Sequence, residues 1–113
     1  MRNYKQGEIV EIAFPFEEKN DKKVRPALII KDFGDSLLVI KITSKHKGRE
    51  WDIEIPKDDF NGLTLDSVIQ VNQCIELEKS EIFCIIPRGV INSLQLAVVK
   101  DRLKQFILKT VQL

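Results

Sequence analysis

The segment VRPALIIKDFGDSLLVIKITS, residues 24–44, contains two apolar runs separated by a short polar stretch. Ala27 to Ile30 is aliphatic and has the length of a buried strand, and the proline in front of it favours an extended conformation for Arg25. Residues 33–35 predict a tight turn, and Leu37 to Ser44 predict the strand that returns from it. We therefore expect a β-hairpin here, with Arg25 at the start of its first strand.

The other apolar segments predict a mainly β fold with a C-terminal helix. They alternate apolar and polar residues as strands do, or repeat them every 3.6 residues as a helix does. Strands do not alternate with helices along the chain, so a parallel α/β sheet is excluded and a small, strongly curved antiparallel barrel is expected. The further strands are Glu8 to Phe14, Glu50 to Pro56, Ser67 to Leu77 and Ile82 to Ile86, and the helix begins at Asn92 or Ser93 with an apolar stripe of Leu96, Val99, Leu103, Phe106 and Ile107.

One expected strand, Ser67 to Leu77, carries a primary amide in an apolar row. Gln73 shares a face with Val71 and Ile75 if the alternation is regular. Burying an amide without a partner costs about 1 to 3 kcal/mol. We therefore expect Gln73 to hydrogen-bond to a specific partner.

The composition is that of one folded domain, which we place at residues 1–113. Its 43% hydrophobic and 31% charged residues differ from the composition of disordered chains. Neither an apolar signal core nor an apolar run of membrane length occurs, so we expect a cytoplasmic protein with no membrane partner. In that compartment Cys74 and Cys84, both within strand-like runs, are expected to be reduced core thiols.

A formal net charge of +1 argues against nucleic-acid binding by bulk electrostatics. Any nucleic-acid site must therefore depend on a local concentration of basic residues. One basic segment follows the hairpin and another precedes it, and they form one site if the fold brings them together; solvated loops are the alternative. The basic candidates are Lys41, Lys45, His46, Lys47 and Arg49, joined by Lys22, Lys23 and Arg25.

Several common catalytic signatures are absent from the sequence. The chain has one histidine, no paired Cys-x-x-Cys, no glycine-rich phosphate loop and no nucleophile elbow. A structural zinc site, a P-loop and an α/β-hydrolase triad are therefore set aside, and any chemistry must use fewer groups.

Four sequence blocks resemble, in their order, the signature blocks of the MazF/PemK family of toxins from toxin–antitoxin modules. The resemblance spans nearly the whole chain, including the C-terminal helical segment. An Arg-Pro pair before an aliphatic run is common by itself, but four blocks in this order are much harder to obtain by chance. The blocks are Lys5 to Val10, Val24 to Ile30, Ile42 to Ser44 and Asp66 to Gln73.

The resemblance implies an SH3-like barrel that forms a homodimer and cleaves single-stranded RNA at short sequences, with no metal and no other cofactor. It also implies a cognate antitoxin that lays an acidic, partly disordered segment across the RNA groove. At matching positions it implies that Arg25 and Thr43 are catalytic and that Gln73 is structural or dimer-forming. Many relatives have a basic residue where this chain has Cys74, so their RNA sequence preference does not transfer to it.

The expected chemistry needs no added nucleophile. RNA holds its own 2′-hydroxyl beside the scissile phosphate, so attack is intramolecular and yields a 2′,3′-cyclic phosphate and a 5′-hydroxyl. The guanidinium of Arg25 can stabilise the phosphorane, and an outward-facing Thr43 or, as second choice, Ser44 can donate a further hydrogen bond. Arginine is a poor general base, so His46, just beyond Thr43, is a candidate for proton transfer, with a solvated histidine as the alternative.

Two other classes of function remain open. A CcdB-type toxin resembles this barrel but binds a protein target such as DNA gyrase; Arg25 and Thr43 would then be dispensable, and loss of toxicity would map to the C-terminal helix. Without a catalytic role, Arg25 would be a surface residue paired with Glu17 or Glu18, and Thr43 would pack in an ordinary strand. An SH3-like binding module would recognise a peptide or nucleic acid without turnover, usually through an aromatic-lined groove. The expected core positions of Phe14, Trp51, Phe83 and Phe106 disfavour such a groove.

Overall fold

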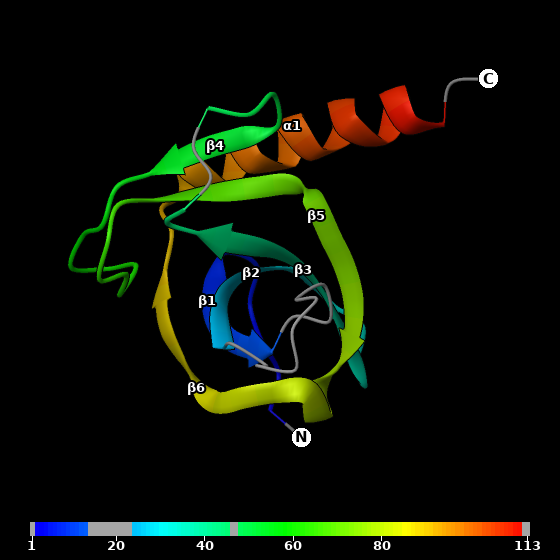
Figure 1. The fold of residues 1–113 in the computed structure, drawn as a ribbon. Coiled ribbons are helices and arrows are strands. Elements are labelled where there is room, and N and C mark those ends of the chain that lie inside the picture. The colour runs from blue at the N-terminus through cyan, green and yellow to red at the C-terminus, as the bar shows by residue number, and fades with distance from the viewer. Residues whose placement is uncertain (1, 14–23, 46–47, 112–113) are drawn as a thin grey trace.

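The computed structural model describes residues 2–13, 24–45 and 48–111, which form six strands followed by one α-helix (Figure 1). The elements are β1 (Glu8–Ala13), β2 (Val24–Asp32), β3 (Ser36–Thr43), β4 (Asp52–Ile55), β5 (Ser67–Glu78), the short 3-10 helix η1 (Lys79–Glu81), β6 (Ile82–Val90) and α1 (Ser93–Thr110). Predictions that fall outside the described residues are those for Phe14, Glu17, Glu18, Lys22, Lys23, His46 and Lys47, and the core prediction for Phe83 concerns a side chain that is not described.

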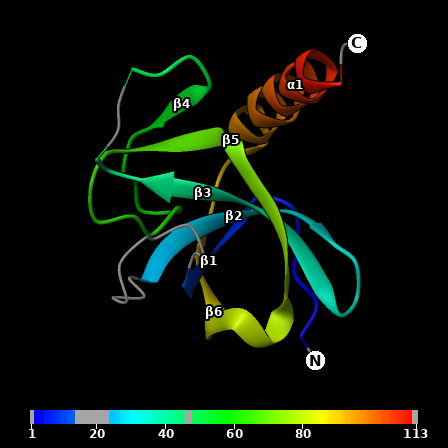
Figure 2. The same ribbon diagram turned by 45° about the vertical axis from the view of Figure 1, so that its right-hand side comes forward.

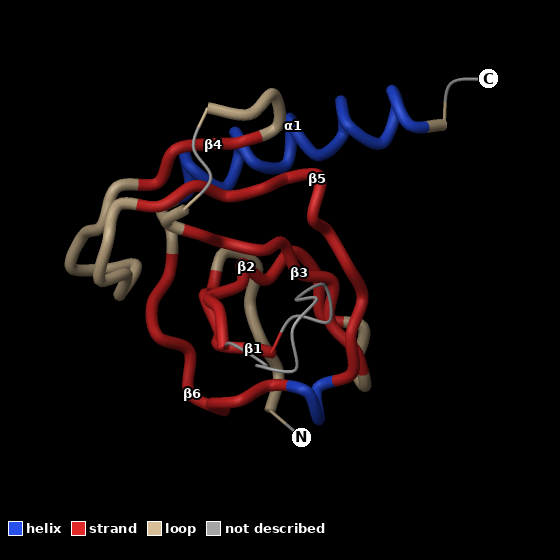
Figure 3. Tube along the Cα trace, viewed as in Figure 1, coloured by secondary structure: helices blue, strands red, loops and turns tan. Residues whose placement is uncertain are grey.

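All the strand pairs are antiparallel, in the order β4-β5-β3-β2-β1-β6. The sheet is strongly curved, and η1 connects β5 to β6 at the end of the fold opposite α1 (Figure 3). β4 and β6 are its two edges, and no pairing within the described ranges joins them. The expected fold, a strongly curved, mainly β antiparallel sheet with a C-terminal helix, is therefore confirmed, and in the described residues the sheet is not closed into a full barrel.

The β2–β3 hairpin forms the centre of the sheet and is buried on both faces. Its register pairs Ala27 with Lys41 and Leu28 with Ile40, and the turn contains Gly34 at a φ of 102°. Leu28 and Ile40 belong to the core cluster that also includes residues of α1, whereas Ala27 belongs to a second cluster on the opposite face. The predicted hairpin is confirmed, and its two faces contribute to both parts of the core.

The helix α1 covers the first cluster and lies beside β5 in both ribbon views (Figures 1 and 2). It begins with a capping box, in which Asn92 and Gln95 each accept the backbone N–H of the other. Val99 and Leu103 are buried as expected, but Ile107 is 49% exposed because the C-terminal part of the helix extends past the sheet. Among the described helices, none is long and apolar enough to cross a membrane.

The strand β5 changes face along its length, which contradicts the apolar row expected around Gln73. Its pairing with β3 shifts register between Ile69 and Cys74, so extra residues bulge from the strand. As a result, Ile69 packs in the cluster beneath α1 while Ile75 packs in the second cluster. Gln73 lies in the bulge and is half-buried, so its amide is not enclosed by aliphatic neighbours along one face.

The strand β6 continues through Pro87 to Val90, although it was expected to end at Ile86. Among the described strands it pairs only with β1, and its register shifts between Cys84 and Gly89. Proline lacks an N–H and is tolerated in such an irregular edge strand. The continuation brings Arg88 into the sheet.

The two cysteines are free thiols, as expected, but only one of them packs against the core. Cys74 is half-buried, and burial raises the pKa of its thiol to about 11. Cys84 is exposed, so the expectation of a core position is wrong for it, because β6 is the edge strand of the sheet.

A buried ion pair connects the N-terminal segment, the hairpin and η1. Lys79, whose side chain is only 4% exposed, lies 2.9 Å from Oδ1 of Asp32 and donates to the carbonyl of Arg2 at 2.9 Å. Asp32 also accepts the backbone N–H groups of Tyr4 and Gly34, each at 2.8 Å. Burial alone would raise the pKa of the Asp32 carboxyl, but these N–H groups and the Lys79 ammonium together lower it below its usual value.

Replacing Lys79 with methionine should destabilise the protein by about 3 kcal/mol, at the low end for a broken buried ion pair, because Asp32 keeps its two backbone donors. The measurement is the free energy of unfolding in urea at neutral pH. The difference should shrink on acidification below the usual aspartate pKa, because the stability contributed by a carboxyl with a lowered pKa is lost as it becomes protonated.

The matched control is Lys109→Met, because the ion pair of Lys109 with Glu50 is exposed and should contribute less than about 1 kcal/mol. If Lys79→Met loses no more stability than this control, the buried pair contributes little to the fold.

Candidate active site

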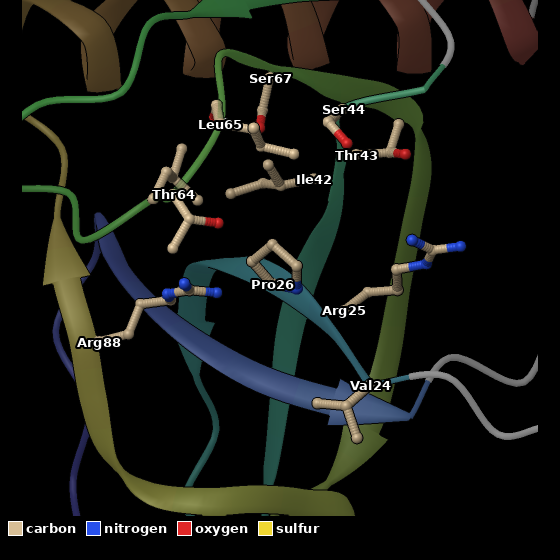
Figure 4. Close-up of a pocket in the computed structure, with 11 residues that line it drawn as sticks. Val24, Arg25, Pro26, Ile42, Thr43, Ser44, Thr64, Leu65, Ser67 and Arg88 are labelled. Atoms are coloured by element: carbon tan, nitrogen blue, oxygen red, sulfur yellow. Dashed lines mark hydrogen bonds between the residues drawn. The ribbon is translucent and has the colours of Figure 1, made fainter.

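A pocket of about 100 Å³ opens where β2 begins and β3 ends (Figure 4). Its other walls are the loop between β4 and β5, the first residue of β5, and one arginine of β6. Two of the described lining side chains are cationic, four carry hydroxyl groups and none is acidic. The lining residues are Val24, Arg25, Pro26, Ile42, Thr43, Ser44, Leu63, Thr64, Leu65, Ser67 and Arg88.

The β2–β3 register brings Arg25 and Thr43 to the same pocket. Continuing the pairing of Ala27 with Lys41 by two residues places Arg25 across from Thr43. The half-buried Arg25 side chain extends from the start of β2 toward the end of β3 in Figure 4. The two residues that the sequence analysis singled out as catalytic candidates therefore line one cavity.

Thr43 is more buried than its expected outward orientation implied. Thr43 is only 4% exposed, because β5 runs alongside β3 here and Val68 of β5 is the pairing partner of Thr43. Its Oγ1 accepts the N–H of Lys45 at 3.2 Å, which leaves the hydroxyl proton for another acceptor. Ser44, the second-choice donor, also lines the pocket, as does Ser67, which the sequence analysis did not propose.

The other predicted binding residues do not line the pocket where they are described. Lys41 lies on β3 across from Ala27, Lys45 is exposed directly beyond Thr43, and Gln73 lies in the β5 bulge. Arg49 is exposed before β4, where its backbone N–H donates to Asp52 at 3.2 Å. The structure gives no placement for Lys22, Lys23, His46 and Lys47.

The loop between β4 and β5 is held in place by Asn61, whose side chain is fully buried. Its Oδ1 accepts the N–H groups of Asp58 at 3.2 Å and Leu63 at 3.0 Å. Gly62 has a φ of 68°, and a Cβ there would lie 2.1 Å from the carbonyl oxygen of Arg88. The loop therefore packs directly on the β6 backbone, at a distance that glycine permits and other residues do not.

Arg88 is a pocket residue that the sequence analysis missed. Its Nε donates to the carbonyl of Gly62 at 2.9 Å, and its Nη1 lies 3.3 Å from Oε1 of Glu11. Figure 4 shows it on the opposite side of the pocket from Arg25. Its position beside Gly89 was only a weak signal in the sequence. The residue was not proposed because β6 was expected to end before it.

Two guanidinium groups and several hydroxyls around one small cavity suit an anion with multiple oxygens, such as a phosphodiester. The described residues include no group of three or more His, Cys, Asp or Glu side chains that could hold a metal ion. The Cys74 thiol, with its raised pKa, does not line the pocket. The pocket chemistry therefore consists of charge stabilisation and hydrogen-bond donation.

Solved toxin structures share this fold. The chain is similar to a MazE–MazF complex from Deinococcus radiodurans, with a TM-score of 0.70, 19% identity, and coverage of 90% of this chain and 92% of the other. For Mycobacterium tuberculosis toxin MazF-mt6 the TM-score is 0.69, with 16% identity over 87% and 93% of the two chains. A mycobacterial endoribonuclease solved with its cognate antitoxin has a TM-score of 0.67 and 10% identity over 88% and 90%.

The sequence comparison identifies the family. No curated protein matches the sequence. Residues 5–107, nearly the whole chain, match the model described as PemK-like, MazF-like toxin of type II toxin-antitoxin system. The resemblance carried by the four sequence blocks is thereby confirmed, and the chain belongs to the PemK-like, MazF-like toxins of type II toxin–antitoxin systems.

Proposed function

We propose that the protein is an endoribonuclease toxin that cleaves single-stranded RNA without a metal ion. The observation that carries the proposal is the convergence of Arg25 and Thr43, from the two strands of the hairpin, in one cationic, hydroxyl-lined pocket. A mycobacterial protein of the same fold is described as an endoribonuclease, and this supports the proposal. Metal independence rests on the substrate, because RNA carries its own nucleophile beside the reacting phosphorus.

In the proposed reaction the 2′-oxygen of RNA attacks the adjacent phosphorus and loses its proton, while the bond from phosphorus to the 5′-oxygen breaks and that oxygen gains a proton. The products are a 2′,3′-cyclic phosphate and a 5′-hydroxyl. The guanidinium of Arg25 binds the oxygens that gain charge in the phosphorane, and the Thr43 hydroxyl donates a further hydrogen bond. Ser44 is the alternative donor on the same wall.

Proton transfer is the step for which the described pocket offers least. Its charged lining residues are arginines, which stay protonated at ordinary pH and make poor general bases. His46 follows the pocket residues Thr43 and Ser44 in the chain and lies outside the described residues. We propose that His46 is not required. The 2′-hydroxyl proton passes to solvent while Arg25 stabilises the negative charge that develops on the phosphorane.

We further propose two protein partners. The first is a cognate antitoxin whose acidic, partly disordered segment covers the cationic pocket, supported by the antitoxin complexes in which proteins of this fold were solved. Cleavage that persists with an equimolar cognate antitoxin present would contradict this. The second partner is another copy of the chain, supported by large apolar side chains that α1 and β6 leave exposed, among them Leu94, Val98, Ile85 and Ile86.

Replacing Arg25 with alanine should lower RNA cleavage on the order of 100- to 1000-fold, because one preorganised donor to the phosphorane is lost. The assay incubates a long single-stranded RNA with each protein in excess EDTA, and maps the ends. Wild type should cut at a recurrent short motif and leave a cyclic phosphate. Arg102→Ala, an arginine of α1 outside the pocket, should cut like wild type.

If neither wild type nor variant cuts RNA while expression still stops growth, a protein target of the CcdB type replaces the ribonuclease proposal. Arg25 is then a structural residue.

The cleavage rate should rise with pH from about pH 6 to about pH 9 without an inflection near neutrality, and His46→Gln should follow the same profile. The reason is that no described lining residue is a carboxylate or imidazole that would titrate in this range. The measurement is the single-turnover rate against pH for both proteins. An inflection near neutral pH that disappears in His46→Gln would instead assign the general base to His46.

Replacing Leu94 with lysine should convert the dimer to a monomer, because this α1 side chain is 78% exposed in the single chain and would carry a charge into the proposed interface. Sedimentation equilibrium measures the mass, which should be twice 13.1 kDa for wild type. Lys104→Glu, at an exposed polar position of α1, should remain dimeric. A monomeric wild type would overturn the dimer proposal.

A further inference from the structure

The pocket contains a second guanidinium that the reaction described above does not use. Arg88 lies across the cavity from Arg25 (Figure 4). It is on β6, which pairs with β1 and with neither described strand of the β2–β3 hairpin. The proposed reaction assigns one guanidinium, that of Arg25, and the hydroxyl donors to the phosphorane. A second cation on the opposite wall therefore needs its own explanation.

Arg88 is held rigidly before any ligand binds. Its Nε–H donates to Gly62 at 2.9 Å and its Nη1 lies 3.3 Å from Glu11, contacts that use two of the five N–H donors of a guanidinium. The backbone beneath it is equally fixed, since a Cβ at Gly89 would lie 2.2 Å from the carbonyl carbon of Asn61. The fork is therefore preorganised, with donors left over on the side of the pocket.

The ion pair with Glu11 does not remove Arg88 from the pocket. The two side chains are 25% and 31% exposed, and the Arg88 side chain still lines the cavity while Glu11 does not. Glu11 lies on β1, where it pairs with Pro26 of the pocket wall. Glu11 thus partly neutralises the charge of Arg88, and it competes with an incoming phosphate for this guanidinium.

We propose that Arg88 is a substrate-binding residue that contacts a phosphate flanking the one held by Arg25, and that Glu11 weakens this contact. The inference rests on the proposed ribonuclease function and extends it. A polynucleotide presents phosphates in succession, so two cations on opposite walls can engage two of them along one strand. Arg25 acts on the reacting phosphate, whereas Arg88 acts on binding and orientation.

The test uses the full chain and two RNAs that contain one mapped cleavage motif, one cleavable and one with the 2′-hydroxyl removed at the cut. For Arg88→Met, KM for cleavage should rise on the order of tenfold while kcat stays within about threefold, because a contact made equally in ground and transition states is lost. The dependence of log affinity on log salt for the uncleavable RNA should fall in slope by about 0.7, the value for one lost phosphate contact.

Glu11→Gln gives a change of the opposite sign and does not depend on whether Arg88→Met folds. It should bind the uncleavable RNA several-fold more tightly, since the competing carboxylate is gone. Lys109→Met and Glu50→Gln make the same charge changes at an exposed ion pair between α1 and the segment before β4, outside the pocket, and should leave KM and the salt slope unchanged.

The outcomes separate the two proposals. If wild type cleaves RNA but Arg88→Met keeps the wild-type KM and salt slope, or Glu11→Gln binds no more tightly than Glu50→Gln, the role of Arg88 is overturned and the ribonuclease proposal stands. If wild type neither cleaves nor binds RNA, both proposals fall together.

Discussion

The antiparallel register of β2 and β3 is the constraint on which the rest of the structure depends. Both strands are buried on both faces, so a slip by one residue would exchange the side chains that pack beneath α1 with those of the second cluster. The same register sets Arg25 across from Thr43. Core packing and the placement of Arg25 beside Thr43 therefore depend on one set of strand pairings.

The opposite wall of the pocket depends on a different contact, in which the loop between β4 and β5 packs on β6. Gly62 and Gly89 allow their backbones to approach closer than any side chain would permit, and Asn61 satisfies the polar groups of the loop. This contact holds Arg88 by its Nε and brings a hydroxyl-bearing loop next to the hairpin. The two walls come from segments distant in sequence, so separate contacts position Arg25 and Arg88 in the pocket.

Local patterns in the sequence predicted the hairpin and the capped helix, because each depends on residues close together in the chain. Arg25 and Thr43 were singled out by the family resemblance, and only the structure brings them to one pocket. The family resemblance supplied the roles proposed for that pair. Gln73 was placed wrongly because a bulge in β5 reverses the alternation, and bulges have no clear local signal. Arg88 was missed because its position depends on tertiary packing of two glycines, and because Pro87 was taken as the end of a strand that in fact tolerates it at a sheet edge.

The net charge of +1 and a function on a polyanion are compatible only if positive charge is concentrated by the fold. In the described part of the chain, two arginines and no acidic side chain line the pocket. Glu11 forms an ion pair with one of these arginines, Arg88, from outside the lining. A carboxylate in that position lowers the cost of partly burying the Arg88 guanidinium in the free protein, and it also lowers the attraction of Arg88 for phosphate. If the site binds RNA as proposed, its affinity depends on the competition between the fixed Glu11 carboxylate and the incoming phosphate, and not on the number of basic residues on the surface.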